Sequence, residues 1–178
     1  MADMNKSLCT GIDKAEYLQV GARVDALSKE VLEIVFSIVE GICAELNNYM
    51  SVIDEVLKDS SAVVTDAELE DFIMNLTSIL YTVSEGQERL GVEEDVAKAI
   101  HKEVYSRVRE KAQGTVADKD TAADLASQNE AIVYMVKARA YRLIKSKVEL
   151  GFEMVNTLKK VITRRIAEIE LSRTTRGG

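Results

Sequence analysis

Basic side chains gather in the last third of this sequence, in a pattern that suits contact with phosphates. Between residues 131 and 178, lysine and arginine outnumber aspartate and glutamate by 11 to 4. Cations neutralise the phosphates of nucleic acids, and Tyr134 and Tyr141 could stack on unpaired bases, a combination typical of single-strand binding. An alternative stays open, because the cations could pair with acidic residues of the chain and the tyrosines could belong to a core. The candidate nucleic-acid-binding residues are Lys137, Arg139, Arg142, Lys145, Lys147, Lys159, Lys160, Arg164 and Arg165.

Two acidic clusters lie earlier in the chain. Paired carboxylates can bind Mg²⁺ or exchange protons with a substrate. Both clusters fall in the first turn of an expected helix, where the helix dipole favours negative charge, so capping is the preferred interpretation. As an alternative, the clusters could bind a cationic surface of a partner protein. Their members are Glu68, Glu70, Asp71, Glu93, Glu94 and Asp95.

Residues that could build a catalytic or metal site are few. His101 is the only histidine, and Cys9 and Cys43 do not have the spacing of a zinc site or a CxxC motif. A nucleophilic triad would also need His101, and no residue pattern promotes one. Neither a P-loop nor a GxGxxG loop for phosphate binding occurs. We therefore expect no enzymatic activity, no metal and no cofactor.

The charges are divided unevenly along the chain. The formal net charge is −7, but residues 1–100 carry 20 acidic and 7 basic side chains, whereas residues 101–178 carry 10 and 16. A basic half can bind a polyanion or the acidic half of another copy. The alternative is that both halves are solvated helical faces.

The composition points to long helices in a reducing compartment. Of the 178 residues, 30% are charged and none is proline, which argues against a β-sandwich or a barrel. No stretch approaches the about 20 apolar residues that span a bilayer, and the first residues do not have the pattern of a signal peptide. Two cysteines cannot form a disulfide framework. A cytoplasmic location without membrane contact is expected.

Hydrophobic periodicity and capping signals predict where the helices begin and end. The first helix is expected from near Asp13 to about Lys58. Between Val31 and Cys43 its apolar residues nearly encircle it, which indicates neighbours on more than one side. The tail after residue 172 contains no apolar anchor and is expected to be disordered.

Two further helices are expected to form the arms of a hairpin. The first arm opens with the capping box Thr65-Asp66-Ala67-Glu68 and ends near residue 113, and Gly86 and Gly91 either bend it or divide it. The second arm opens with the capping-box spacing of Thr121 and Asp124 and continues unbroken to about residue 171. The expected domains are a helical segment over 1–64, the hairpin over 65–172 and the tail over 173–178.

The second arm carries the strongest periodic signal of the chain. A column at seven-residue spacing consists of Tyr134, Tyr141, Val148, Val155, Ile162 and Ile169. A companion column contains Ile144, Gly151 and Leu158, with Lys137 and Arg165 as polar exceptions. This spacing predicts sustained helix pairing. We therefore expect an all-α protein, a long antiparallel coiled-coil-like hairpin with an additional N-terminal helix, which self-associates.

The segment from about Leu69 to Leu171 resembles the UvsY-type recombination mediators of bacteriophages. The resemblance rests on the alternating apolar and charged first arm, on the turn GTVADKDTAAD, and on the second arm beginning SQNEAIVYMVKARAYRLIKSKVELGFEMV. Proteins of this type are non-enzymatic and oligomeric, bind single-stranded nucleic acid and load a recombinase. The resemblance implies the same properties here, and a bacterial host cytoplasm if the chain is encoded by a phage.

The chain departs from that pattern in its acidic balance and its N-terminal helix, and two alternatives follow. The first is an acidic helical inhibitor of the anti-CRISPR or another counter-defence type, which would block the cationic channel of a nucleic-acid enzyme. The second is a structural scaffold. The expected partners are other copies of the chain and either single-stranded nucleic acid or a nucleic-acid-processing protein, such as a recombinase or a Cas-type nuclease.

Overall fold

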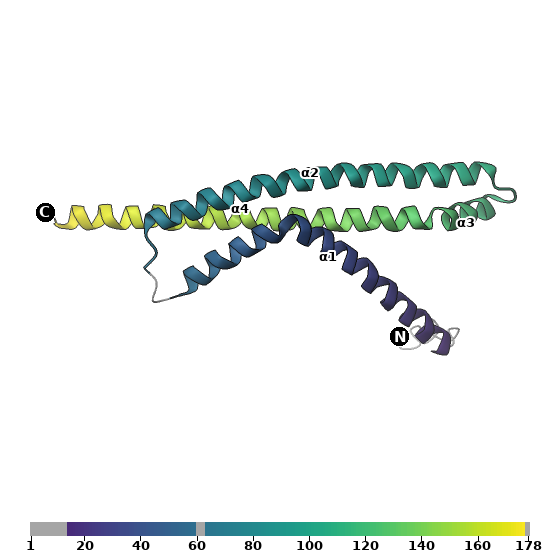
Figure 1. Cartoon of the computed structure of the whole chain (residues 1–178), viewed down its shortest axis with the longest axis horizontal. Coiled ribbons are helices and arrows are strands. Elements are labelled where there is room, and N and C mark those ends of the chain that lie inside the picture. The colour runs from purple at the N-terminus through teal and green to yellow at the C-terminus, as the bar shows by residue number, and fades with distance from the viewer. Residues whose placement is uncertain (1–13, 60–62, 177–178) are drawn as a thin grey trace, which may run out of the picture.

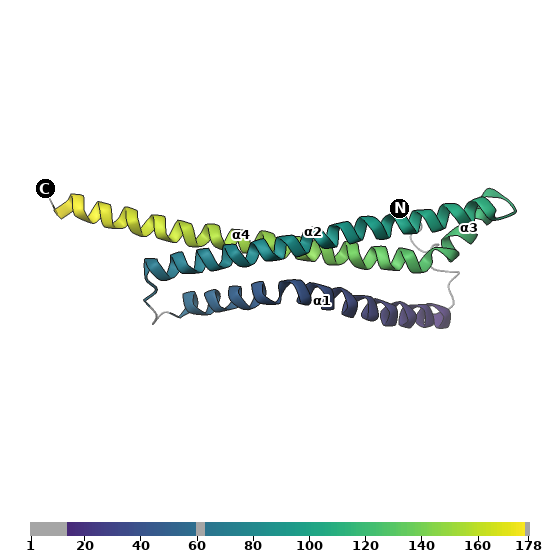
Figure 2. The same cartoon turned by 45° about the horizontal axis from the view of Figure 1, so that its top comes forward.

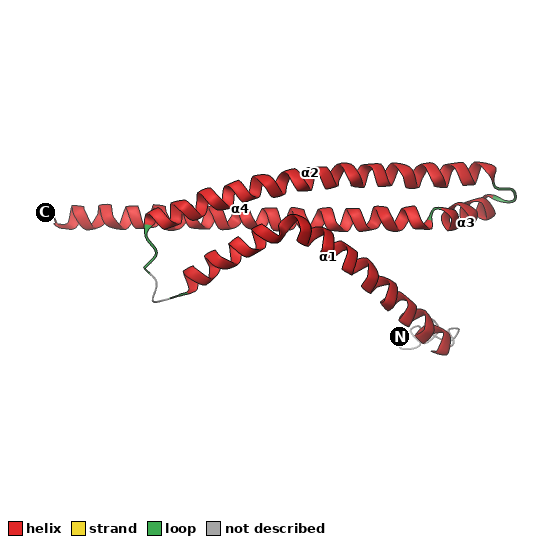
Figure 3. Cartoon of the chain, viewed as in Figure 1, coloured by secondary structure: helices red, strands yellow, loops and turns green. Residues whose placement is uncertain are grey.

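Four helices and no strand make up residues 14–59 and 63–176, which are the residues that the structure, a computed structural model, describes. The helices are α1 (Lys14–Lys58), α2 (Asp66–Lys111), α3 (Val116–Ala126) and α4 (Gln128–Arg176). α2 and α4 lie antiparallel along most of their length, and α3 forms the tip between them (Figure 1, Figure 3). In this view the middle of α1 meets the hairpin and its two ends angle away from it. The predicted all-α hairpin with an additional N-terminal helix is confirmed.

The capping box predicted at the start of α2 is present. The hydroxyl of Thr65 accepts a hydrogen bond from the backbone N–H of Glu68 at 3.2 Å, and the Glu68 carboxylate accepts one from the backbone N–H of Thr65 at 2.7 Å. These bonds satisfy two groups that the helix end would otherwise leave unpaired, and an N-cap of this kind contributes about 1 kcal/mol. α2 therefore begins where the sequence indicates.

α2 passes through Gly86 and Gly91 without a break. A Cβ at Gly86 would lie 2.9 Å from Cγ2 of Ile42 in α1, and a Cβ at Gly91 would lie 3.2 Å from the ring of Tyr141 in α4. Both distances are shorter than side chains normally tolerate. The two glycines therefore let neighbouring helices approach α2 closely, and they do not divide it.

The turn of the hairpin differs from the sequence prediction. Gly114 has a φ of 112°, and the residue that caps the following helix is Thr115, whose hydroxyl accepts a hydrogen bond from the backbone N–H of Asp118 at 3.3 Å. The capping box predicted at Thr121 and Asp124 is wrong, because both residues lie inside α3. Because the chain turns at Gly114, α3 can begin directly after it. The N-cap is therefore Thr115, six residues before the predicted Thr121.

The prediction of an unbroken second arm is also wrong, because Ser127 separates α3 from α4. Its Oγ donates a hydrogen bond to the backbone carbonyl of Ala123 at 2.9 Å, and its side chain is buried. A serine hydroxyl that bonds the backbone one turn earlier bends a helix. α3 is tied to α2 by Asp120, whose carboxylate accepts hydrogen bonds from the Tyr105 hydroxyl at 3.2 Å and from Arg109 Nε at 2.5 Å.

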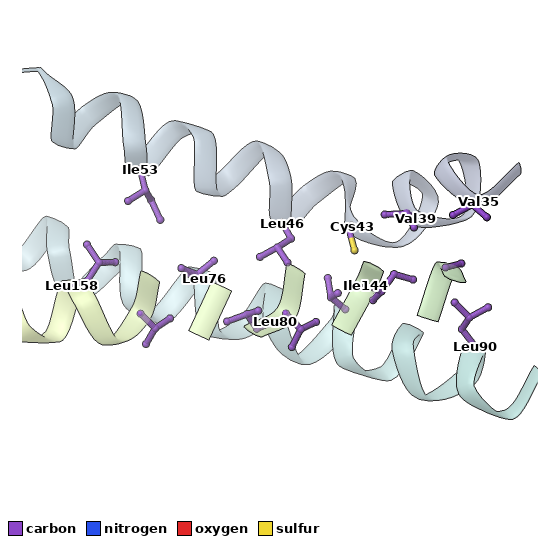
Figure 4. Packing of buried hydrophobic residues seen from close by; sticks show 14 of the residues in the cluster. Val35, Val39, Cys43, Leu46, Ile53, Leu76, Leu80, Leu90, Ile144 and Leu158 are labelled. Carbon is purple, nitrogen blue, oxygen red and sulfur yellow. The ribbon is translucent and has the colours of Figure 1, made fainter. Parts of the chain in front are cut away.

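α4 supplies the centre of the core through the two predicted columns. Val148 and Val155 of the first column are buried, as are Ile144, Gly151 and Leu158 of the second. Figure 4 shows Ile144 and Leu158 of α4 among buried residues of the other two long helices, including Leu76, Leu80, Leu90, Leu46 and Ile53. The seven-residue spacing therefore marks the side of α4 that faces its partners.

α1 divides into two parts with different surroundings. Residues 35–57, which we call the docked half, pack on the hairpin through buried side chains that include Val35, Cys43 and Leu46. Residues 18–34, which we call the undocked half, contain no buried side chain, and among them only the partly buried Val31 packs against the core. In Figure 1 this half diverges from the hairpin, and Figure 2 shows it continuing α1 along the same general direction. The predicted start near Asp13 lies outside the described residues.

α4 extends beyond the start of α2 and ends at Arg176 (Figure 1). Residues 173–176 are therefore helical, whereas a disordered tail was expected over 173–178; residues 177 and 178 lie outside the description. Ile169, the last member of the first column, is exposed. Asp66, the first residue of α2, lies opposite Arg165, so α2 does not reach Ile169 one turn further along α4. Over the described residues, none of the helices contains an apolar stretch long enough to cross a membrane.

Candidate nucleic-acid interface

Three of the nine candidate cations of α4 bond to other helices. Lys137 Nζ donates to the Glu93 carboxylate of α2 at 2.6 Å, and Lys147 Nζ donates to the side-chain oxygen of Asn47 in α1 at 2.7 Å. Arg165 also bonds across the hairpin, donating to the Asp66 carboxylate at 2.9 Å and to the Val64 carbonyl at 2.8 Å. Lys137 and Arg165 are the polar exceptions of the companion column, so these exceptions form ion pairs between helices.

Two further candidates bond within α4. Arg164 pairs with Glu168 at 2.9 Å, one turn away, and Arg142 Nε donates to the carbonyl of Ala138 at 3.2 Å. Both side chains remain exposed. An exposed pair of this kind contributes little to stability, and a phosphate could displace it.

The cationic groups of four candidates face solvent and make no ion pair or hydrogen bond with another described residue: Arg139, Lys145, Lys159 and Lys160. They lie along the middle of α4, between the inward-pointing Lys137 and Arg165. The nine cations therefore do not form one continuous basic surface. Lys137 and Arg165 at its ends, and Lys147 between them, bond to other parts of the fold.

Phe152 lies between two of these free lysines on the same side of α4. Lys145, Phe152 and Lys159 are spaced by seven residues, so each is about two turns, or about 10.5 Å along the axis, from the next. All three are exposed, and Phe152 retains 48% of its accessible surface. An exposed aromatic ring between two cations offers a stacking surface and two phosphate contacts in one line. We call these three residues the Lys145–Phe152–Lys159 row.

The tyrosines that the sequence suggested as base platforms are engaged within the hairpin. Tyr141 packs against Gly91, and Lys98 Nζ lies 5.9 Å from the centre of the Tyr134 ring. Both tyrosines are partly buried. Both rings are therefore less available for stacking than the exposed Phe152, whose seven-residue spacing from Lys145 and Lys159 is visible in the sequence.

Arg139 and Arg142 border a second feature, a groove of about 460 Å³ between α4 and α1. Leu143 and Phe36 form part of its apolar lining. The neighbouring groove along the same two helices contains Glu33 and Glu40, whose charge would repel a phosphate. This side of α4 is therefore less suited to a polyanion than the Lys145–Phe152–Lys159 row.

Two of the six acidic candidates make contacts within the fold. The two hydrogen bonds from Thr65 hold the pKa of Glu68 below its usual range, and the hydrogen bond from Lys137 does the same for the pKa of Glu93. Glu70, Asp71 and Asp95 are exposed and Glu94 is partly buried. The structure therefore brings Glu68 and Glu93 into cap and pair contacts and does not gather the six into one site.

The described residues contain no cluster of histidine, cysteine, aspartate and glutamate that could hold a metal ion. His101 lines a shallow pocket with Lys102, Tyr105 and Asp124, at the tip of the hairpin. Burial raises the pKa of the Cys43 thiol, which disfavours the reactive thiolate. The absence of enzymatic activity stays a prediction.

No protein-family model matches the chain, and comparison with curated proteins and with solved structures also finds no match. A functional assignment must therefore be based on the residues and contacts described above.

Proposed function

We propose that this protein binds single-stranded nucleic acid along the exposed side of α4 and performs no catalysis. The observation that supports this proposal best is the Lys145–Phe152–Lys159 row, in which an exposed ring lies between two lysines without internal partners. The aromatic ring stacks with a base and the lysines neutralise phosphates on either side of it.

A single strand suits this row better than a duplex. Stacking on Phe152 requires the free face of an unpaired base, which a duplex does not present along its length. Glu149 and Glu153 lie on the exposed side of α4 next to Phe152. Because their charges repel phosphates, the strand is expected to run along the row and not across it.

The proposal is tested by fluorescence anisotropy of a labelled oligothymidine, titrated with protein over a range of salt concentrations. Binding is expected at low salt and should weaken as salt rises, with a slope of about 0.7 per phosphate contact for a single strand. The double substitution Lys145→Glu and Lys159→Glu should weaken binding at least tenfold and reduce that slope. Phe152→Ala should cost about 1–3 kcal/mol of binding free energy with little change in slope.

Matched controls come from α2. Lys102→Glu with Lys111→Glu makes the same change of charge at two exposed lysines away from the row, and Tyr81→Ala removes an exposed ring. Both controls should retain most of the affinity. The proposal is wrong if no binding occurs at low salt, or if the controls lose as much affinity as the variants of the row.

The resemblance to recombination mediators extends the proposal to a recombinase that would share the bound strand. Co-sedimentation of this chain with a recombinase, with and without oligonucleotide, would test that extension separately. An inhibitor that acts through the acidic clusters has less support, because Glu68 and Glu93 already serve the fold.

A further inference from the structure

The undocked half of α1 exposes a long apolar surface. A helix of this length is marginal in water unless its apolar face is packed, and single proteins rarely expose large continuous apolar patches. The exposed apolar residues of α1 from its undocked half to the first turn of the docked half lie on two sides of the helix. Val20, Val24, Leu27 and Ile34 lie on one side, and Leu18, Leu32 and Phe36 lie toward the other. This surface therefore requires a partner.

The hairpin has a matching apolar groove of about 460 Å³. Val92, Val96 and Ile100 of α2 and Val133 of α4 line it, and these four side chains are largely exposed. Glu130 also lines the groove, and its Oε2 is shielded from solvent but accepts no hydrogen bond from a described residue. The groove thus offers an apolar floor and one carboxylate oxygen that lacks a donor.

The groove continues the surface on which the docked half packs. Tyr49 of α1 meets Phe72, with ring centres 6.4 Å apart, and Ile42 meets Gly86. Continuing from Phe72 and Gly86 at seven-residue steps leads to residues 93 and 100, which line the groove. From Ile42, which lies opposite Gly86, seven residues back along α1 reach Val35, opposite residue 93, and fourteen reach Ser28, opposite residue 100.

We propose that the undocked half of α1 from one copy of the chain lies in the groove of a second copy, and that the second copy returns the same contact. Each chain carries both surfaces, so two copies related by a two-fold axis cover both at once. Arg23 of the incoming helix, which lies next to Leu27 on the helical wheel, would supply a cation for the unsatisfied oxygen of Glu130.

Two observations favour a second copy over closure of α1 onto its own groove. α1 is one continuous helix without proline, and its course carries residues 18–34 away from the hairpin of its own chain (Figure 1). Leu18, Leu32 and Phe36 are exposed and lie toward the side of α1 opposite to Leu27. Closure of Val24 and Leu27 onto the groove of the same chain would leave these three side chains in water, whereas a second chain can cover them.

The first experiment locates the contact by disulfide trapping. Cys9 is replaced by serine, and the buried Cys43 is kept. Leu27→Cys is placed in one chain and Ile100→Cys in a second chain with a tag of different size, and the purified chains are mixed and oxidised. A disulfide between the two tagged species is expected; Leu125→Cys in place of Ile100→Cys, at an exposed site on α3, should give little product.

The same two cysteines placed in one chain separate the two arrangements. The proposal predicts covalent dimers, which a denaturing gel separates from monomers. A monomer with an internal disulfide, formed at a concentration where the mixed chains give no product, would show closure within the chain and overturn the proposal.

Sedimentation equilibrium supplies the second measurement. The unmodified chain should dimerise, and Val24→Glu or Val96→Glu should each raise the dissociation constant at least tenfold, because each places a charge in the apolar contact. Leu125→Glu, at an exposed apolar residue of α3, should leave the constant unchanged. A monomer at all concentrations tested, or equal weakening by Leu125→Glu, would overturn the proposal.

Discussion

The two halves of α1 have similar sequences but different surroundings. Both carry apolar residues at three- and four-residue steps, yet Leu46 in the docked half is completely buried whereas Leu27 in the undocked half keeps 49% of its surface exposed. The docked half meets α2 and α4 together, and it fills the space that both helices leave open. The difference shows that an amphipathic pattern predicts a helix with a partner but not which chain provides that partner.

Truncating one leucine in each half gives the largest expected contrast. Leu46→Ala removes a side chain from the centre of the core and should lower the free energy of unfolding by about 2–5 kcal/mol. Leu27→Ala should cost less than about 0.5 kcal/mol in the monomer, where the residue is exposed. Urea denaturation at a protein concentration low enough to keep the chain monomeric measures both; equal losses would mean that residue 27 packs on its own hairpin.

Glycine substitutions test the same contrast with the opposite change in volume. A Cβ at Gly151 of α4 would lie 2.6 Å from Leu80 Cδ2 and 3.4 Å from Leu46 Cδ1. Because both leucines are buried and cannot move freely, Gly151→Ala should cost about 1–3 kcal/mol. Gly21 of the undocked half has no atom within 4 Å of its added Cβ, so Gly21→Ala should stabilise the helix by about 0.5–1 kcal/mol. Thermal unfolding of both variants would reveal opposite shifts in Tm.

Ion pairs should couple more strongly in the hairpin than in the undocked half. Lys137 and Glu93 join α4 to α2 at 2.6 Å, whereas Lys29 and Glu33 lie one turn apart on α1 at 4.0 Å. A double-mutant cycle with alanine should give a coupling of up to about 1 kcal/mol for the first pair, because both side chains are partly exposed. The second pair should couple less, and added salt should weaken both. A stronger coupling for Lys29 and Glu33 than for Lys137 and Glu93 would contradict this prediction.

Acid should weaken the hairpin through carboxylates that its caps and ion pair hold ionised. Hydrogen bonds lower the pKa of Glu68, Glu93 and Asp118, first from Thr65, Lys137 and Thr115 respectively. A carboxyl group with a lowered pKa in the folded state contributes stability above its unfolded pKa, and that contribution is lost as the pH falls through the folded value. Urea midpoints should therefore decline below about pH 4.

Glu68→Gln is the matched variant for this pH dependence, since it keeps the size of the side chain and removes its titration. Its urea midpoint should vary less with pH than that of the unmodified chain, because one group no longer binds a proton on unfolding. An identical pH dependence in both proteins would show that the capping carboxylate does not contribute to acid sensitivity.

Local signals in the sequence predicted the features that depend on neighbours within one or two helical turns. The capping box at Thr65 and the apolar columns of the second arm required only the order of residues, because hydrogen bonding at a helix end and the helical repeat are local. The same reasoning placed a cap at Thr121, because two threonine-to-aspartate spacings compete there. The hydrogen bonds between Thr115 and Asp118, together with the positive φ of Gly114, show that the earlier one is used.

Tertiary structure decided which charges are available and which apolar surfaces have partners. Residue type alone does not separate the bonded cations Lys137, Lys147 and Arg165 from the free ones Lys145 and Lys159. The first three are bonded because helices distant in sequence place Glu93, Asn47 and Asp66 beside them. Gly86, Gly91 and Gly151 could have been breaks, and packing made them points of close approach. Residue order therefore determined the helices and their apolar faces, whereas contacts between distant segments determined the free cations of α4 and the uncovered half of α1.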